Sequence, residues 1–309
     1  MRSPRVDDAQ HLPRIGTLTE RTQRPRSVAS IAWRRYRRDR PAVAGLIVLL
    51  LLVLLALSAG LISEHVTGFS PTQQDIRNRF QPIGSNGYLL GSDQLGRDTF
   101  TRLLFGARVS LGIAGLSIVV ALLVGAAYGV VSGYFGGWVD GVLMRIVDVL
   151  LAVPSLFLLL LIASMWRMGP LALAFVIAAT AWVTLSRLVR GEVLALRQRE
   201  YVEAARIAGD RPVRVMVRHI LPNVLPVIIV WASLTVPGLI LAEAGLSYLG
   251  LGIQPPTPSW GNMLSDSQRV WSHSAALVLL PGIAIYLAVF AINLVGNGLR
   301  DALDPRLTE

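Results

Sequence analysis

The amino-acid sequence predicts an all-α integral membrane protein with six membrane-spanning helices. Of its 309 residues, 53% are hydrophobic and 16% are charged, and the mean hydropathy is +0.56. Ordinary soluble domains carry about 25% charged residues. Six apolar runs come close to or exceed the ~20 residues that a helix needs to cross the hydrocarbon layer. They are Ala42–Ile62, Val109–Val131, Val142–Ala163, Met168–Leu185, Val224–Leu246 and Ala275–Leu294.

The first apolar run predicts an uncleaved anchor. It follows a long basic flank, and it is longer than the roughly 7–15-residue core of a signal peptide. The flank ends in the basic and aromatic stretch Trp33–Arg38. Such a stretch is typical of a segment held against anionic lipid, more than of a nucleic-acid site. We therefore expect membrane lipid, and no nucleic acid, as a partner of this segment.

The distribution of arginine predicts the topology. Arginines concentrate before the first run, between the fourth and fifth runs, and after the sixth. Basic loops stay on the cytoplasmic side, so we expect both termini in the cytoplasm. The expected organisation is a cytoplasmic Arg-rich tail at 1–40, a membrane anchor at 41–63 and an extracytoplasmic loop at 64–108. A five-helix core follows at 109–300, with a cytoplasmic loop at about 189–222, and the C-terminus at 301–309 is cytoplasmic.

Two missing residue types limit the chemistry. The chain contains no Cys, so it has no disulfide, no thiol nucleophile and no Cys-ligated metal. It also contains no Lys, which excludes a Walker-type phosphate loop and a Schiff base. Its four His residues are scattered, and no pair has metal-ligand spacing. We expect neither an enzyme nor a metal site.

The loop between the fourth and fifth runs predicts a helix–turn–helix. Arg197–Ala208 is rich in helix formers, and Gly209 suits the left-handed position that ends a helix. We expect Asp210 to cap the next helix, with Pro212 in its first turn and Pro222 at its end.

The first helix of this loop has a surface suited to close contact. Ala204, Ala205 and Ala208 are small, and the arginines around them, including Arg206 and Arg211, could pair with acidic groups of another protein. A docking loop and a structured loop without a partner are equally consistent with these residues alone.

The spacing of the loop resembles a known motif. Glu203-Ala204-Ala205, then Gly209 after three residues, then Leu221-Pro222, is similar to the loop of binding-protein-dependent ABC importer permeases. In that family the loop forms a coupling helix that docks into a groove on a cytoplasmic ATPase. The resemblance implies that the contact is made by Glu203, Ala204, Ala205, Arg206, Ala208, Gly209, Asp210 and Arg211.

Other stretches resemble one branch of that family. Residues 90–98, 246–252, 254–261 and 298–305 are similar to the C-type permease subunit of the oligopeptide, dipeptide and nickel branch, as is His219 in a position where the wider family has Ile. Asn297 departs from the Asp that is common there. The resemblance runs from about Pro41 to Leu307.

This resemblance implies a fold, a location and partners. The fold is that of a type I ABC importer permease in a bacterial cytoplasmic (inner) membrane. The expected partners are a homologous B-type permease subunit, two ATPase subunits or domains, and an extracytoplasmic substrate-binding (lipo)protein. ATP and Mg²⁺ would bind the ATPases, and no cofactor would bind this chain. Dipeptides, longer peptides, nickel chelates and glutathione-like molecules all remain open as cargo.

Polar residues within the apolar runs are further candidates. Glu243 and Asn293 are predicted to line the translocation path, although Glu243 could equally reach the outer interface. Arg145 and Asp148 are three residues apart and predict a structural ion pair. Asn293 and Asn297 lie on one helix face and could bond across helices.

Two other classes of function were weighed. An ion-coupled secondary transporter would often show inverted repeats and acidic groups at the span centres. We find no repeat and few such groups. An intramembrane enzyme would need a base beside a membrane Ser, and no His lies in a span.

Overall fold

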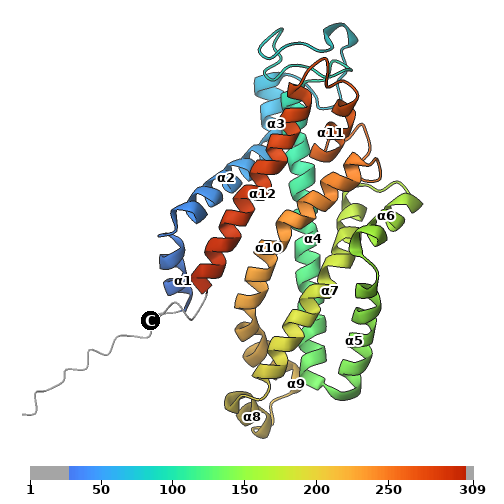
Figure 1. The fold of residues 1–309 in the computed structure, drawn as a ribbon. Helices are drawn as coiled ribbons and strands as arrows, with labels where there is room; N and C mark the ends of the chain where they lie inside the picture. Colours follow the sequence, from blue (N-terminus) through green and yellow to red (C-terminus); the bar gives the residue numbers. More distant parts are fainter. Residues whose placement is uncertain (1–27, 304–309) are drawn as a thin grey trace, which may run out of the picture.

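The structure, a computed structural model, describes residues 28–303 and is built from helices (Figure 1). Five stretches are long and apolar enough to cross a membrane. These are α2 (Arg40–Leu57), α4 (Thr99–Phe135), α7 (Pro170–Leu196), the continuous stretch Pro212–Tyr248 that contains α10 (Leu221–Tyr248), and α12 (Ala276–Leu303). A sixth crossing exists if the bent pair α5 (Gly137–Ala152) and α6 (Ser155–Met165) forms one span.

The remaining elements are short. They are α1 (Val28–Tyr36), α3 (Ala59–Ile62), α8 (Glu200–Ile207), α9 (Pro212–Val215) and α11 (Trp260–Gln268), with π turns at Ser63–Thr67 and Met216–Ile220 and a 3-10 turn at Ile76–Asn78. Figure 1 shows α11 and the loop before α4 at one end of the molecule, with α8 and α9 at the other.

The centre of the fold is the contact between α4 and α7. Gly125, Gly129 and Gly133 recur every four residues along α4, so they form a stripe on one face. A Cβ atom at Gly129 would lie 2.5 Å from the carbonyl oxygen of Ser186 and 2.7 Å from Cβ of Val189. The two helices therefore approach each other more closely than any larger residue would allow, as small-residue stripes do in membranes.

The first span packs on the last. Gly45 of α2 faces α12, where an added Cβ would lie 2.8 Å from the carbonyl oxygen of Ala291. At the end of α12, Gly298 faces Ala42 in the same way. The Tyr36 hydroxyl donates to the carbonyl oxygen of Ala42, which fixes α1 beside the start of α2. The arrangement leaves α2 at the edge of the helix bundle (Figure 1).

The third predicted span is not one helix. The run Val142–Ala163 bends by 81° between α5 and α6. Val153 adopts an extended conformation with φ −97° and ψ 125°, and Pro154 follows it. A residue before proline is pushed out of the helical region by the proline ring, which accounts for the break. The prediction of one continuous helix over this run was wrong.

The second span begins earlier than its apolar run indicates. Helix α4 begins at Thr99, where the Asp98 side chain accepts a hydrogen bond from the Thr101 N–H at 2.7 Å. The capping geometry is the ordinary one for a helix start. Its first turns are therefore polar, and they carry Arg102, which is buried.

Candidate functional site

Helix α8 is anchored to the body by one buried side chain. Val202 is fully buried and packs in an apolar cluster with Val193 of α7 and Val215 of α9. Beside it, the Arg206 guanidinium lies over the ring of Tyr134 at 4.5 Å from the ring centre. A cation over an aromatic face is attracted by the ring quadrupole. The loop is therefore held to the end of α4 that carries Tyr134 and to the C-terminal end of α7.

The turn after α8 has the predicted geometry. Gly209 has φ +85°, which is the left-handed region. Its N–H donates to the carbonyl oxygen of Arg206 at 3.0 Å, and the Asp210 N–H donates to that of Ala205 at 3.1 Å. These two bonds define a Schellman motif, in which a left-handed glycine satisfies the last carbonyl groups of a helix.

The rest of α8 is open to solvent. Glu203, Ala204, Arg206 and Ala208 are exposed, and Ile207 is 82% exposed. The exposed surface of this segment therefore mixes one large apolar side chain with small and charged ones.

Only part of the predicted alanine surface faces solvent. Ala205 is half-buried and packs against the cluster around Val202, so Ala204 and Ala208 are the outward members. Arg211 is exposed and Asp210 is half-buried. The eight predicted contact residues thus lie together in one short segment.

Two details of the predicted loop were wrong. Asp210 does not cap the next helix; Arg211 holds that position without a side-chain bond, and the Asp210 carboxylate accepts from Arg214 at 3.1 Å. Pro222 does not end a helix either. It follows the π turn Met216–Ile220, and helix α9, the π turn and α10 run on without a break.

A pocket of about 370 Å³ lies between the α5–α6 bend, α7 and α10. Its walls are mainly apolar, and its polar atoms include the hydroxyl groups of Ser155, Thr180, Thr184 and Thr235. No charged residue lines it. Sequence reasoning missed these hydroxyl residues because nothing in the local pattern separates them from ordinary helix packing.

The structure does not bring Glu243 to this pocket. Glu243 is fully buried and accepts hydrogen bonds from Ser110 of α4 at 2.6 Å and Ser247 at 2.7 Å. Both hydroxyl oxygens also accept backbone N–H groups, those of Trp260 and Ile253 respectively. The carboxyl group thus joins α4 and α10 to the start of α11 and the segment before it, and it is enclosed by protein.

Asn293 also lies away from the pocket. It is half-buried on α12 and is absent from the pocket lining. The suggested bonds of Asn293 and Asn297 across helices do not occur among the hydrogen bonds of the described residues.

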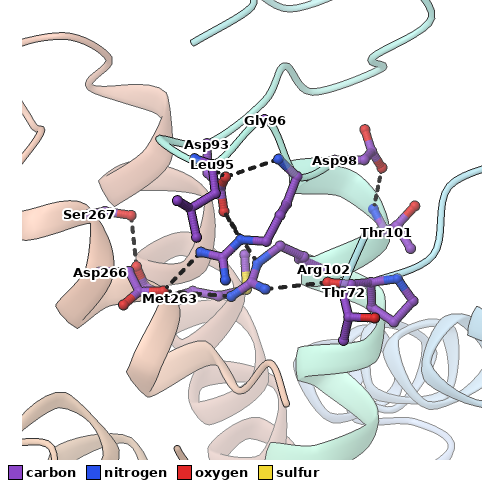
Figure 2. Close-up of polar contacts among 12 residues, drawn as sticks. Thr72, Asp93, Leu95, Gly96, Asp98, Thr101, Arg102, Met263, Asp266 and Ser267 are labelled. Carbon is purple, nitrogen blue, oxygen red and sulfur yellow. Dashed lines mark hydrogen bonds and ion pairs between the residues drawn. The ribbon is translucent and has the colours of Figure 1, made fainter. Parts of the chain in front are cut away.

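A second polar cluster lies at the end of the fold opposite α8. Figure 2 shows Arg102 of α4 and the loop residue Asp93 facing Asp266 of α11. Arg97 Nη2 lies 3.2 Å from Asp266, and Arg102 Nη2 lies 3.7 Å from it. Both arginines also pair with Asp93. Arg97 and Arg102 are thus both buried and ion-paired.

Helices α5 and α7 are joined by ion pairs of their own. Asp148 pairs with Arg187, and Asp140 pairs with Arg190. The predicted partner of Asp148, Arg145, was therefore wrong. The true partner lies 39 residues away along the chain, and no local spacing rule could have found it.

Two known protein-family models match this chain. Residues 121–309 match the family model described as "Binding-protein-dependent transport system inner membrane component". Residues 27–82 match "N-terminal TM domain of oligopeptide transport permease C".

Relatives cover most of the chain. The chain is 40% identical over 280 residues to the "Dipeptide transport system permease protein DppC" of Bacillus subtilis, covering 89% of this chain and 85% of the relative. It is 38% identical to the "Oligopeptide transport system permease protein OppC" of the same organism, covering 88% of each. It is also 38% identical to the "Glutathione transport system permease protein GsiD" of Pectobacterium atrosepticum, covering 89% and 90%. The chain therefore belongs to the family of binding-protein-dependent transport system inner membrane components.

Proposed function

We propose that this chain forms half of the pore of an ATP-driven peptide importer and couples to an ATPase through α8 and Gly209. As a permease subunit of this family it is a transport component and not an enzyme, because ATP hydrolysis belongs to separate subunits. Membership of this family also removes the support for an ion-coupled secondary transporter. The other half of the pore would be a homologous B-type permease.

The α8 loop carries the proposal. It combines a buried anchor at Val202, a defined turn at Gly209 and an exposed surface that includes Ile207. A rigid base with an exposed apolar residue is suited to receive force from a partner and pass it to α7. The expected partners are two ATPase subunits, which bind ATP and Mg²⁺, with one of them docked on this loop.

The names of the relatives and the pocket support a peptide as cargo. The relatives are named for dipeptide, oligopeptide and glutathione transport. The pocket offers hydroxyl groups and apolar walls without charge, which suits the amide backbone of varied peptides better than one fixed ion. Selection among peptides would fall to an extracytoplasmic substrate-binding (lipo)protein.

The proposed orientation places α8 and both termini in the cytoplasm. The arginine distribution supports it. The fold is consistent with it, because α8 lies at the end of the molecule opposite α11, and α1 and the end of α12 also lie away from α11 (Figure 1). The N-terminal tail at 1–27 and residues 304–309 lie outside the described residues.

The test uses bulky residues on the outward alanines. In proteoliposomes holding the complete transporter, Ala204→Trp and Ala208→Trp should weaken ATPase binding and abolish ATP-dependent uptake of labelled trialanine. Ala195→Trp is the matched control, because Ala195 is exposed on α7 near the loop and outside the proposed contact. The control should keep both binding and uptake.

Two results would overturn the proposal. If both loop variants keep full ATPase binding and full uptake, the loop is only a connector. If the wild-type complex takes up trialanine with a proton gradient and without ATP, the energy source is wrong. Membrane insertion of each variant is measured in parallel, so that a folding defect is recognised.

A further inference from the structure

Helix α5 has little apolar packing to hold it in place. Of its 16 residues only Val147 is buried. Large apolar side chains such as Trp138, Ile146 and Val149 are exposed in the single chain. Since tight packing is what normally fixes a helix on its neighbours, other contacts must set the position of α5.

Polar contacts provide that position. Arg190 of α7 donates to Asp140 through two nitrogen atoms, with Nε at 2.5 Å from Oδ1, and Ser132 of α4 donates to the same carboxylate. Further along α5, Arg187 pairs with Asp148. Bidentate pairing of arginine with a carboxylate is both strong and directional.

A third, neutral contact reaches α5 from α4. The Tyr128 hydroxyl donates to the carbonyl oxygen of Leu143 at 2.9 Å. This bond holds the helix backbone without touching the carboxylates of α5, which pair with arginines of α7 and, at Asp140, also accept from Ser132 of α4. The charged contacts of α5 within the described residues are therefore directed to a single neighbour.

The Arg187–Asp148 pair involves a residue within the apolar run Val142–Ala163. Eight residues separate Asp140 from Asp148, which is about 12 Å along a helix axis. Charged groups within membrane segments are costly unless paired, and they commonly have a functional role. In the isolated chain the side chains of Arg187 and Asp148 are 50% and 48% exposed. The pair therefore does not form merely because packing encloses both charges.

These pairs lie between the two candidate sites. Helix α7 carries Arg187 and Arg190 on one face, ends at Leu196, and leads within a few residues into α8. The opposite end of α5 reaches the bend, where Leu150 and Pro154 line the pocket. A displacement of α8 can thus pass along α7 and cross to α5 through these contacts, in addition to a route through Tyr134 of α4 and the Gly136 connection to α5.

We infer that the pairs Arg187–Asp148 and Arg190–Asp140 make α5 follow α7, so that movement of the α8 loop changes the shape of the pocket. The four residues are positioning residues: they touch neither ATP nor cargo. The inference rests on the proposed coupling role of α8. It predicts that breaking a pair uncouples ATP hydrolysis from uptake.

The experiment reverses the charges of the more exposed pair. Asp148→Arg, Arg187→Asp and the double variant are assembled into the complete transporter in proteoliposomes, and trialanine uptake and ATP hydrolysis are measured in the same vesicles. Each single variant should keep ATPase binding and hydrolysis while uptake per ATP falls at least about tenfold, within the range of typical coupling effects. The double variant should recover most of the uptake.

Controls separate this role from a structural one. Arg145→Asp makes the same charge reversal on α5 at an exposed residue that forms none of the ion pairs within the described residues. It should leave uptake per ATP unchanged. If the reversals are not inserted, Asp148→Asn and Arg187→Gln remove the pair with smaller changes and should also lower uptake per ATP.

The inference is overturned by either of two results. In the first, the single variants take up as much trialanine per ATP as the wild type. In the second, uptake per ATP is as low in the double variant as in the single variants. A wild-type chain that binds no ATPase would instead overturn the proposed function, and this inference with it.

Discussion

At the scale of single residues, Gly209 offers the clearest substitution. A Cβ atom added there would meet nothing of this chain within 4 Å, so within the chain a substitution acts through the backbone conformation at φ +85°. Side chains other than glycine cost about 1–2 kcal/mol in this region, and asparagine costs less. Gly209→Val should therefore weaken ATPase binding about 5–30-fold. Gly209→Asn should weaken it less, as measured by titration of the ATPase; equal affinities for both variants would contradict the conformational reading.

Asp98 should make stability depend on pH. Its side chain is buried and one of its oxygen atoms has no partner among the described residues. Burial raises the pKa of this carboxyl above its ordinary value of 3.8, and hydrogen bonds with Thr101 offset only part of the rise. The folded protein therefore holds the proton more tightly than the unfolded chain, so stability falls as pH rises through the interval between the two pKa values.

The measurement compares thermal unfolding of the wild type and Asp98→Asn in detergent. Asparagine keeps an oxygen that can cap α4 but does not titrate. Above about pH 4 the wild type should lose stability relative to the variant as pH rises. Parallel curves across this interval would show that the buried carboxyl does not contribute.

At the scale of elements, the ion-paired cluster of Asp93, Arg97, Arg102 and Asp266 should fix α11 on α4. Arg102→Gln leaves Asp93 and Asp266 with Arg97 as the only cation of the four-residue cluster. An uncompensated buried charge typically costs about 3–5 kcal/mol, so the melting temperature should fall clearly. Adding Asp266→Asn restores neutrality and should recover part of the loss.

Hydrogen exchange in α11 would locate the effect of this cluster. Arg108→Gln, at an exposed residue of α4, the helix that carries Arg102, serves as the control and should change neither exchange nor stability. A double variant no more stable than Arg102→Gln alone would contradict the role of charge balance.

The same scale shows what sequence could predict. Apolar runs located the spans, since burial in lipid demands long apolar helices. The left-handed Gly209 followed from local backbone chemistry. The bend at Pro154 was also local, and the restriction on Val153 was available in the sequence. By contrast, the Ser110–Glu243 bond and the Arg187–Asp148 pair join distant segments, and only the packed fold brings their atoms together.

At the scale of the whole molecule, the topology is directly testable because the chain has no native Cys. Single Cys probes at Asn86, in an exposed loop, and at Val213, an exposed residue of α9, lie at opposite ends of the fold. In intact cells, a membrane-impermeant maleimide should label the probe at Asn86. It should label the probe at Val213 only after the cells are permeabilised. The reverse pattern would invert the molecule and place the α8 loop outside the cell.

The glycine stripe of α4 also has a consequence for the order of synthesis. Gly133 meets Val193, which lies 60 residues further along the chain. At about 5–20 residues per second, roughly 3–12 s pass before the ribosome has made the partner surface. During that interval the narrow face of α4 lies against lipid or against whatever assists insertion. For a few seconds in each round of translation, the protein thus depends on its surroundings to cover the glycine face of α4, because α7 has not yet been made.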